Sequence, residues 1–379
     1  MSSAEAVIIG AGPAGLAAAQ QLLAVGVRPM IFEKADAVGA VWRRHYDRLH
    51  LHTPRSLSAL PGMPIPAAYG RYPSRAQFVD YLERYAEAFD LRPAFGATVR
   101  AVRRAGDGWR VEAGAEAVET SNVVVATGWA DFPHAPTWPG LESFGGPIVH
   151  SSAYRNAEPY VGKRVLVIGF GNSGAEIALD LCEQGAAPTL AVRSPVRILP
   201  RDLFGVPILR FSVAQRFLPA RLADAINAPI IRLAVGPIEP LGLRTPAKGP
   251  IQTVKDDGRV PLFDIGTLAQ IRAGRIAVRG AVARFAPQSA TFADGRAEPF
   301  DAVILATGFR PDLRALLPDA ARALDGQGRP LVSDRPTAEP GLFFVGAIPS
   351  AIGQLNQIGV GARRIAAAAA ARLARERRG

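Results

Sequence analysis

Cysteine is almost absent from this chain of 379 residues, with Cys182 as its single representative. One thiol excludes an internal disulfide, and it excludes the Cys-x-x-Cys pair with which dithiol reductases pass electrons on. Low cysteine usage also favours a reducing, cytoplasmic compartment. We expect Cys182 itself to be a small buried core residue, because a free cysteine packs like a small hydrophobic side chain.

Long hydrophobic runs are also missing. No apolar stretch reaches the roughly 18 residues that would span a bilayer, so we expect no transmembrane segment. The first five residues lead directly into an apolar strand pattern, so no signal peptide is expected. The composition, 49% hydrophobic and 20% charged, is that of an ordinary globular protein, and the length suffices for two domains.

Lysine is scarce although the net charge is +11, because most of the 44 basic residues are arginines. These arginines are scattered, and the one dense cluster lies in residues 372–378. No basic stripe with interleaved aromatic residues is present, so we expect no nucleic-acid partner. We interpret the charge as a basic surface with a solvated C-terminal tail, and attraction of an anionic substrate or cofactor as the second interpretation.

The chain does contain, twice, a glycine-rich turn between an apolar run and a helix-like segment. In the first copy, residues 6–9 lead into Gly10-Ala11-Gly12-Pro13-Ala14-Gly15. The first glycine allows a tight turn, the second lets a pyrophosphate approach the backbone, and the third lets helix and strand pack closely. Glu33 ends the next apolar run, where a carboxylate binds a ribose hydroxyl. This copy therefore predicts a site for the adenosine ribose of FAD.

The second copy lies in mid-chain, where residues 165–168 lead into Gly169, Gly171 and Gly174. At the position of the acid in the first copy, this copy has Arg193, followed by Ser194. An arginine there accommodates a 2′-phosphate, so this copy predicts NADPH rather than NADH. Two dinucleotide sites on one chain indicate that one cofactor reduces the other. Because the dithiol is missing, the reduced flavin is left with oxygen chemistry or transfer to a soluble acceptor.

The order of these patterns predicts an α/β fold with two Rossmann-like dinucleotide-binding domains, the NADPH domain inserted into the FAD domain. We expect the FAD domain to comprise residues 1–155 and 295–379. The NADPH domain is expected at residues 156–294, with a helical insertion at about 198–250. This insertion either covers a site or is an ordinary helical excursion, and a dimer surface and a membrane-surface patch are also open.

Shorter patterns complete this architecture. Two apolar strands that end in Ala-Thr-Gly, at residues 126–128 and 306–308, are expected near the crossings between the domains. Ser74 is the expected N-cap of a helix to Phe89. The last helix is expected over residues 358–378.

The segment from Phe144 to Tyr154 resembles the fingerprint of the flavin-containing monooxygenases, Phe-x-Gly-x-x-x-His-x-x-x-Phe/Tyr. The related Baeyer–Villiger group usually has tryptophan or proline at the last position. Further motifs, spread over nearly the whole chain, resemble the plant YUCCA branch, whose members oxidatively decarboxylate indole-3-pyruvate. These motifs are residues 47–52, Asn172-Ser173 and residues 198–201, 241–243, 248–250 and 264–268.

The resemblance implies a reaction in which NADPH reduces FAD and oxygen then forms a flavin C4a-(hydro)peroxide. The expected function is oxidative decarboxylation of an aryl α-keto acid such as indole-3-pyruvate, with a small organic molecule and O2 as partners. The alternatives are N- or S-oxygenation or Baeyer–Villiger oxidation of a small metabolite, and an NADPH oxidase. A flavin-binding module without catalysis is disfavoured by the intact motifs. The sequence leaves the oligomeric state open.

The resemblance also implies positions for the cofactors. No catalytic residue is assigned, because the flavin carries the oxygen chemistry, but His52, Arg75 and Asn356 are candidates. His150 is expected to organise a domain linker, and Gln354 and Asn356 are expected to precede the last helix. No metal site is expected. Expected at FAD are Gly10, Gly12, Pro13, Ala14, Gly15, Glu33, Lys34, Trp42, His52, Thr53, Val102, Thr127, Gln354 and Asn356. Expected at NADPH are Gly169, Gly171, Asn172, Ser173, Gly174, Arg193 and Ser194.

Overall fold

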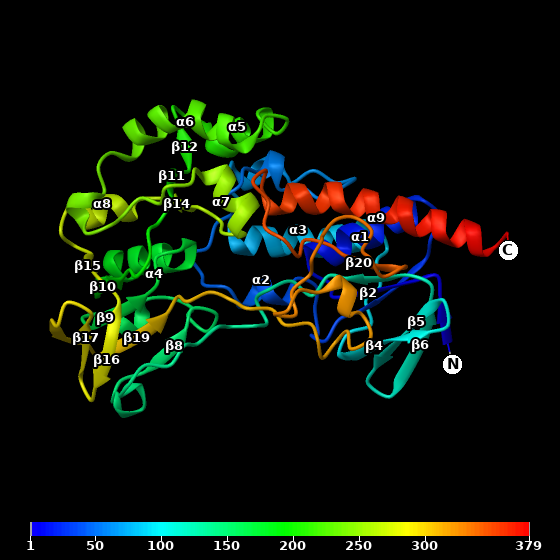
Figure 1. The fold of residues 1–379 in the computed structure, drawn as a ribbon, viewed down its shortest axis with the longest axis horizontal. Helices are drawn as coiled ribbons and strands as arrows, with labels where there is room; N and C mark the ends of the chain where they lie inside the picture. Colours follow the sequence, from blue (N-terminus) through cyan, green and yellow to red (C-terminus); the bar gives the residue numbers. More distant parts are fainter. Residues whose placement is uncertain (1, 379) are drawn as a thin grey trace. The chain divides into compact units, whose positions relative to one another are not determined.

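The computed structural model describes residues 2–378, which form two compact units (Figure 1). Unit 1 comprises the described residues up to Arg43, residues 53–132, and those from Arg310 onward. Unit 2 comprises Arg44–His52 and Pro133–Phe309. The chain passes between the units shortly after each Ala-Thr-Gly turn, at residues 132–133 and 309–310. These boundaries differ from those expected at residues 155 and 295.

Unit 1 is built on a parallel four-stranded sheet. Its strands are short and almost entirely apolar, as is typical of parallel sheets that are covered on both faces. Helices α1 (Pro13–Ala24) and α9 (Gln354–Glu376) pack against each other in this unit. The strand order is β20 (Leu342–Phe344), β7 (Val123–Val125), β2 (Ala6–Ile9), β3 (Pro29–Phe32).

Helix α3 (Arg75–Ala88) of unit 1 begins as expected. Ser74 is its N-cap, and a capping box joins Ser74 and Gln77 by reciprocal side-chain to backbone hydrogen bonds. A second sheet of this unit has the order β1 (Ser2–Ala4), β6 (Glu116–Thr120), β5 (Gly108–Ala113), β4 (Val99–Ala105).

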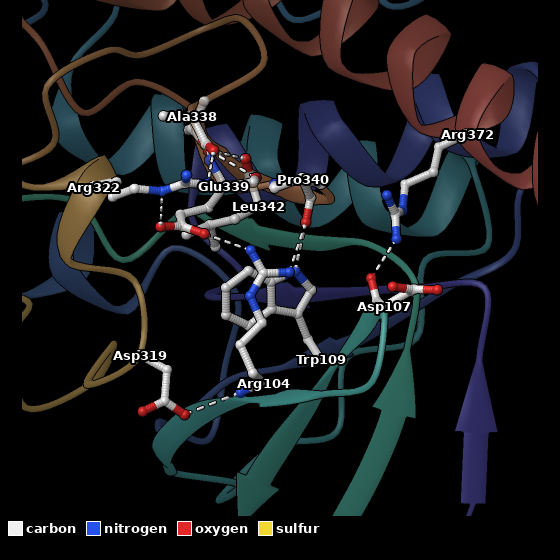
Figure 2. A network of polar contacts seen from close by, with 11 residues as sticks. Arg104, Asp107, Trp109, Asp319, Arg322, Ala338, Glu339, Pro340, Leu342 and Arg372 are labelled. Atoms are coloured by element: carbon white, nitrogen blue, oxygen red, sulfur yellow. Dashed lines mark hydrogen bonds and ion pairs between the residues drawn. The ribbon is translucent and has the colours of Figure 1, made fainter.

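A polar network joins this second sheet to the turn before β20 (Figure 2). The guanidinium of Arg104 lies 3.9 Å from the ring centroid of Trp109 and forms an ion pair with the buried Glu339. Arg322 donates to the same carboxylate over 3.1 Å, and Trp109 Nε1 donates to the Pro340 carbonyl over 3.0 Å. Burial acts to raise the pKa of Glu339, but the two arginines outweigh it and hold this pKa below its ordinary value.

Unit 2 is built on a parallel five-stranded sheet. Strands β8 (Ile148–His150) and β19 (Ala302–Leu305) belong to it because β19 hydrogen-bonds to both β9 (Arg164–Ile168) and β8. This pairing moves the unit boundaries outward from residues 155 and 295. Helix α4 (Asn172–Glu183) follows β9 and packs against the sheet. The strand order is β15 (Ala277–Arg279), β10 (Ala187–Ala191), β9 (Arg164–Ile168), β19 (Ala302–Leu305), β8 (Ile148–His150).

The segment expected as a helical insertion at 198–250 is helical only in part. It opens with strands, because β11 (Ile198–Pro200) pairs with the distant β14 (Leu262–Asp264). Two further short strands form a hairpin at Asp202–Leu203 (β12) and Val206–Pro207 (β13). The helices that follow are α5 (Ile208–Ala214), α6 (Ala220–Val235) and α7 (Pro250–Asp257).

The remaining elements are short. Unit 2 also has helix α8 (Thr267–Arg272) and an antiparallel sheet of β16 (Val282–Ala286), β17 (Ser289–Phe292) and β18 (Ala297–Pro299). Helix α2 spans Ala40–Arg44. Between residues 2 and 378, no helix combines the length and apolarity needed to cross a membrane. Single 3-10 turns occur at Arg55–Leu57, Ala67–Tyr69, Leu141–Ser143, Glu158–Tyr160, Glu239–Leu241 and Ala321–Ala323.

Candidate functional site

The two glycine-rich turns have the same backbone geometry. Gly10 has φ 108° and Gly169 has φ 109°, a conformation that a residue with a side chain rarely adopts. A Cβ on Gly10 would lie 2.7 Å from the Ala126 carbonyl oxygen, and one on Gly169 would lie 2.3 Å from that of Ala306. Each turn is therefore packed against the end of the strand that carries an Ala-Thr-Gly motif in its own unit.

The other glycines divide into tight and open positions. A Cβ on Gly15 would lie 1.9 Å from the Gly10 carbonyl oxygen, and one on Gly174 would lie 2.1 Å from that of Gly169. A Cβ on Gly12 or Gly171 would meet no heavy atom within 4 Å. These two open glycines are the N-caps of α1 and α4, and neither helix has a side-chain cap. The uncapped N–H groups and the open space fit a dinucleotide pyrophosphate at each turn.

Glu33 lies at the first glycine turn, directly after β3. Its side chain is nearly buried, and Oε2 accepts a hydrogen bond from the Ala11 N–H over 2.7 Å. Oε1 accepts from the Ala35 N–H over 2.9 Å. The carboxylate is thus held beside the residues that would surround the phosphates. Its neighbour Lys34 forms an ion pair with Asp131 at 3.0 Å, and Pro13 and Ala14 begin α1.

Arg193 and Ser194 are exposed in the loop after β10. The Arg193 carbonyl accepts a hydrogen bond from Nη2 of Arg244 over 2.8 Å. Arg244 is exposed as well, and sequence reasoning missed it because it lies 51 positions later in the chain. The Arg244 guanidinium therefore lies against the backbone of Arg193, where the 2′-phosphate of NADPH is expected.

Asn172 and Ser173 form the first turn of α4 but make contacts within the protein. Asn172 Oδ1 accepts from the Phe263 N–H over 2.8 Å, and its Nδ2 donates to the Pro261 carbonyl over 3.0 Å. Ser173 hydrogen-bonds to the phenol of Tyr46. In this structure the Asn172 side chain holds the start of β14.

Three residues expected near the flavin lie in unit 1. Trp42 packs its ring edge-on against Phe78, with centroids 4.5 Å apart. Thr53 Oγ1 lies 2.5 Å from Ser58 Oγ. Arg75 Nη1 donates to the Arg43 carbonyl over 2.8 Å. The first turn of α3 is thereby tied to the end of α2.

Val102 and Thr127 also lie in unit 1, in different settings. Val102 is fully buried in β4, and its N–H donates to the Leu316 carbonyl over 2.8 Å. This position therefore offers neither a side chain nor an N–H to a ligand. Thr127 lines a small cavity together with Trp129 and Phe344.

The expectation that Gln354 and Asn356 precede the last helix is wrong, because both lie in the first turn of α9. Two glycines early in this helix, Gly359 and Gly361, weaken the helix pattern in the sequence. Gly361 is required by packing, since a Cβ there would lie 2.4 Å from Asp334 Oδ1. Gln354 Nε2 donates to the Gly346 carbonyl over 2.9 Å. Asn356 Nδ2 donates to the Ile352 carbonyl, four positions earlier, over 3.5 Å.

His52 is placed in unit 2, where its Nε2 hydrogen-bonds to Glu176 Oε1. Glu176 lies two positions after the third glycine, and only 1% of its surface is exposed. Tyr46 is buried beside it, and burial together with the nearby Glu176 raises the pKa of the Tyr46 phenol well above its ordinary value. The short segment Arg44–His52 thus binds the helix that begins at the second glycine turn.

Helix α4 contacts this segment through three carboxylates spaced at i, i+4 and i+7: Glu176, Asp180 and Glu183. Arg48 forms an ion pair with Glu183 and lies 4.0 Å from Asp180. Sequence reasoning missed this row of carboxylates. The i, i+4, i+7 spacing of these acids on a predicted helix could have indicated that they share one face.

The fingerprint segment, Phe144 to Tyr154, packs against several elements of unit 2. Phe144 packs edge-on against Phe285 at 5.7 Å, and a Cβ on Gly146 would lie 2.3 Å from the Asp301 carbonyl oxygen. Tyr154 is buried and donates to Asp180 Oδ2 over 2.6 Å. Cys182, on the same helix as Asp180, packs against the core of unit 2 but is only partly buried, so the expectation of a small buried core residue holds in part. Within residues 2–378, no group of three or more His, Cys, Asp or Glu is arranged to hold a metal ion.

His150, the third fingerprint position, connects this segment to the second Ala-Thr-Gly turn. Its Nε2 lies 3.1 Å from the Gly308 carbonyl oxygen, and its Nδ1 lies 3.1 Å from the Ser152 N–H. The neutral ring with its proton on Nε2 satisfies both contacts. Thr307 Oγ1 donates to the His134 carbonyl, so the turn is held from two sides.

We expect His150 to titrate below the ordinary histidine value of 6.5. Burial lowers its pKa most and His134 lowers it further, against the opposing hydrogen bond to the Gly308 carbonyl. The unfolded chain therefore binds this proton first as the pH falls. The stability that neutral His150 contributes is complete above pH 6.5, and it is lost as the pH falls from 6.5 through the folded-state pKa of His150.

A histidine titration by NMR, with His150→Asn to assign the signal, measures this pKa. Urea unfolding between about pH 5 and pH 7 should show a steeper loss of stability with falling pH in the native chain than in His150→Asn. A pKa at or above 6.5 contradicts the expectation.

Comparisons with known proteins found a matching family model, similar proteins and similar solved structures. A family model described as pyridine nucleotide-disulphide oxidoreductase matches residues 7–200. The indole-3-pyruvate monooxygenase YUCCA1 of Oryza sativa subsp. japonica is 44% identical over 328 residues, which are 85% of this chain and 81% of that protein. YUCCA6 of Arabidopsis thaliana is 37% identical over 354 residues, which are 90% of this chain and 84% of that protein. A flavin-containing monooxygenase structure from Stenotrophomonas maltophilia superimposes with a TM-score of 0.75 at 27% identity, covering 97% of this chain and 99% of that one.

Proposed function

The chain belongs to the YUCCA-like branch of the flavin-containing monooxygenases, which use FAD, NADPH and O2, and we propose that its substrate is an aryl α-keto acid such as indole-3-pyruvate. The proposed reaction converts the keto acid, O2, NADPH and a proton into the aryl acetic acid, CO2, NADP⁺ and water. The observation that carries the proposal is the 44% identity with a named indole-3-pyruvate monooxygenase over 85% of this chain.

In this proposal the protein binds, orients and shields the cofactors. Bound FAD supplies the oxygen chemistry after reduction by NADPH, and the chain's own residues supply none of the redox steps. The N–H groups at the start of α1 hold the FAD pyrophosphate, and Glu33 holds the ribose. The N–H groups at the start of α4 hold the NADPH pyrophosphate.

The proposed reaction is tested by measuring products against NADPH consumed. The FAD-loaded enzyme is mixed with NADPH, air and either indole-3-pyruvate, phenylpyruvate or pyruvate. We expect one CO2 and one aryl acetic acid for each NADPH with the two aryl keto acids, and little turnover of pyruvate. NADPH oxidation that yields only hydrogen peroxide across the aryl panel contradicts the proposal and favours an oxidase. Turnover of an amine, a sulfide or a ketone in place of the keto acids favours N-oxygenation, S-oxygenation or Baeyer–Villiger oxidation, respectively.

We propose that Arg193 binds the 2′-phosphate of NADPH together with Ser194 and the adjacent Arg244. Arg193→Ala is expected to lower kcat/KM for NADPH about 100-fold, because it removes a charge-assisted contact to the phosphate. The value for NADH, which lacks this phosphate, should change little. Arg244→Ala is expected to act in the same direction.

The matched control for Arg193 is Arg284→Ala, an exposed arginine of β16 in the same unit. It should leave both coenzymes unaffected. Equal losses with NADPH and NADH in Arg193→Ala mean that the 2′-phosphate is bound elsewhere.

A further inference from the structure

The segment that contains α5 and α6 exposes large apolar side chains to solvent. Phe204 is 84% exposed, Phe217 is 83% exposed and Leu233 is 81% exposed. In Figure 1, α5 and α6 lie at the margin of unit 2, on the far side of β11 and β14 from α4. Neither glycine turn nor any other cofactor-binding candidate lies in this segment. The proposed reaction therefore assigns no role to its apolar surface.

Helix α6 places four of these apolar residues on one face. Leu222, Ile226, Ile230 and Leu233 are spaced at i, i+4, i+8 and i+11, and each is exposed. The buried residues of the helix, which include Ala223 and Ile231, lie on the face that packs on α7 and β11. The helix is therefore apolar on two faces, of which only one is covered. We call the exposed residues Phe204, Phe217, Leu222, Ile226, Ile230 and Leu233 the α6 surface.

The exposed charges within residues 203–238 are all positive, and the exposed Glu239, just beyond this stretch, interacts with Arg232. Exposed arginines lie along the segment at positions 210, 216, 221 and 232, and Arg216 stacks on Phe217 with 4.3 Å between guanidinium and ring centroid. Between residues 203 and 238 the sequence has one acid, Asp224. Asp224 is buried, and its two oxygens accept the N–H groups of Ile251 and Gln252 at the start of α7, each over 2.9 Å. No carboxylate in this stretch therefore faces solvent beside the arginines.

We propose that the α6 surface binds the interface of an anionic phospholipid bilayer. Its apolar side chains enter the boundary between headgroups and acyl chains, and the arginines contact the phosphates. From Leu222 to Leu233 the helix rises about 17 Å. Its two arginines, Arg221 and Arg232, lie along one edge of the apolar stripe, so the helix lies along the membrane rather than across it. A second copy of this chain fits less well, because a two-fold interface would bring the same arginines together.

Flotation of the FAD-loaded full-length protein with lipid vesicles tests this proposal. We expect binding to vesicles that contain phosphatidylglycerol, weaker binding to phosphatidylcholine alone, and release as salt is raised. The double variant Ile226→Asp/Leu233→Asp should lose binding at least tenfold, because charged groups cannot enter the acyl boundary. Arg221→Ala and Arg232→Ala should each weaken binding to anionic vesicles about fivefold.

Leu331→Asp, at a residue 55% exposed in unit 1, is the matched control and should bind vesicles like the native chain. NADPH oxidation without vesicles should be the same in all variants, which shows that they are folded. The proposal is overturned if the native chain does not bind anionic vesicles, or if the α6 double variant binds them equally well. It is also overturned if light scattering shows a dimer that the double variant disrupts while vesicles are not bound, because the surface then belongs to a second copy.

Discussion

Gly174→Ala is expected to abolish reduction of the flavin by NADPH and to lower the free energy of unfolding by about 2–3 kcal/mol. The new Cβ would lie 2.1 Å from the Gly169 carbonyl oxygen and 3.2 Å from the Ala306 Cβ. The first of these neighbours is backbone, so the contact cannot be relieved by rotating a side chain. Helix α4 must move away from β9, and the N–H groups at its start then no longer point at the pyrophosphate. Anaerobic mixing with NADPH, followed by the flavin absorbance, measures the loss.

Gly171→Ala is the matched comparison three positions earlier on the same turn. Its Cβ would meet no protein atom within 4 Å, and the backbone there is extended, so the variant should fold with nearly native stability. The methyl group would instead occupy the space that the pyrophosphate needs, so the KM for NADPH should rise. The two variants separate folding of the turn from access of the cofactor. A Gly174→Ala protein with native stability and native NADPH affinity would show that the turn tolerates displacement.

The two glycine units could be predicted from the sequence because their determinants are local. Each motif lies within about ten residues of the strand before it, and the positive φ of Gly10 and the close approach at Gly15 occur where the motif requires them. The same holds for the capping box at Ser74, in which both partners lie within one helical turn. Glu33 also follows its strand directly and lies at the turn, as expected.

The unit boundaries could not be predicted in this way, because they depend on strand pairing across long stretches of sequence. Strand β19 hydrogen-bonds to β9 and β8, both of which lie far earlier in the chain. The pairing of β11 with β14 likewise turns the start of the expected helical insertion into sheet. The segment Arg44–His52 belongs to unit 2 through its contacts with the row of carboxylates on α4. Helix α4 lies more than 100 positions later in the chain than this segment.

The fingerprint illustrates what a family resemblance leaves out. The fingerprint indicates the chemistry of the chain, yet its histidine, His150, acts here by hydrogen-bonding to a backbone carbonyl oxygen. His150 contacts Gly308, and Ala306 of the same turn lies against Gly169. The fingerprint therefore supports the second glycine turn from behind, through the second Ala-Thr-Gly motif.

Glu176→Ala is expected to lower the free energy of unfolding by about 3 kcal/mol. The carboxylate is 1% exposed and hydrogen-bonds to His52, and its removal leaves a partly buried ring nitrogen without its partner and a cavity beside Tyr46. Urea unfolding of the FAD-loaded enzyme measures the change. Glu183→Ala, at the more exposed end of the same row, should cost less than about 1 kcal/mol because its ion pair with Arg48 is near the surface.

The Glu176→Ala variant also tests whether His52 is a positioning residue rather than a catalytic one. Because His52 is bound by Glu176 in unit 2, His52→Ala and Glu176→Ala should impair the same step, NADPH-dependent flavin reduction, and their double variant should be little worse than either alone. Glu176→Gln keeps an acceptor for the ring and should restore most of the rate. If His52→Ala instead slows only the steps after flavin reduction, His52 acts on oxygen or substrate, and its contact with Glu176 serves another purpose.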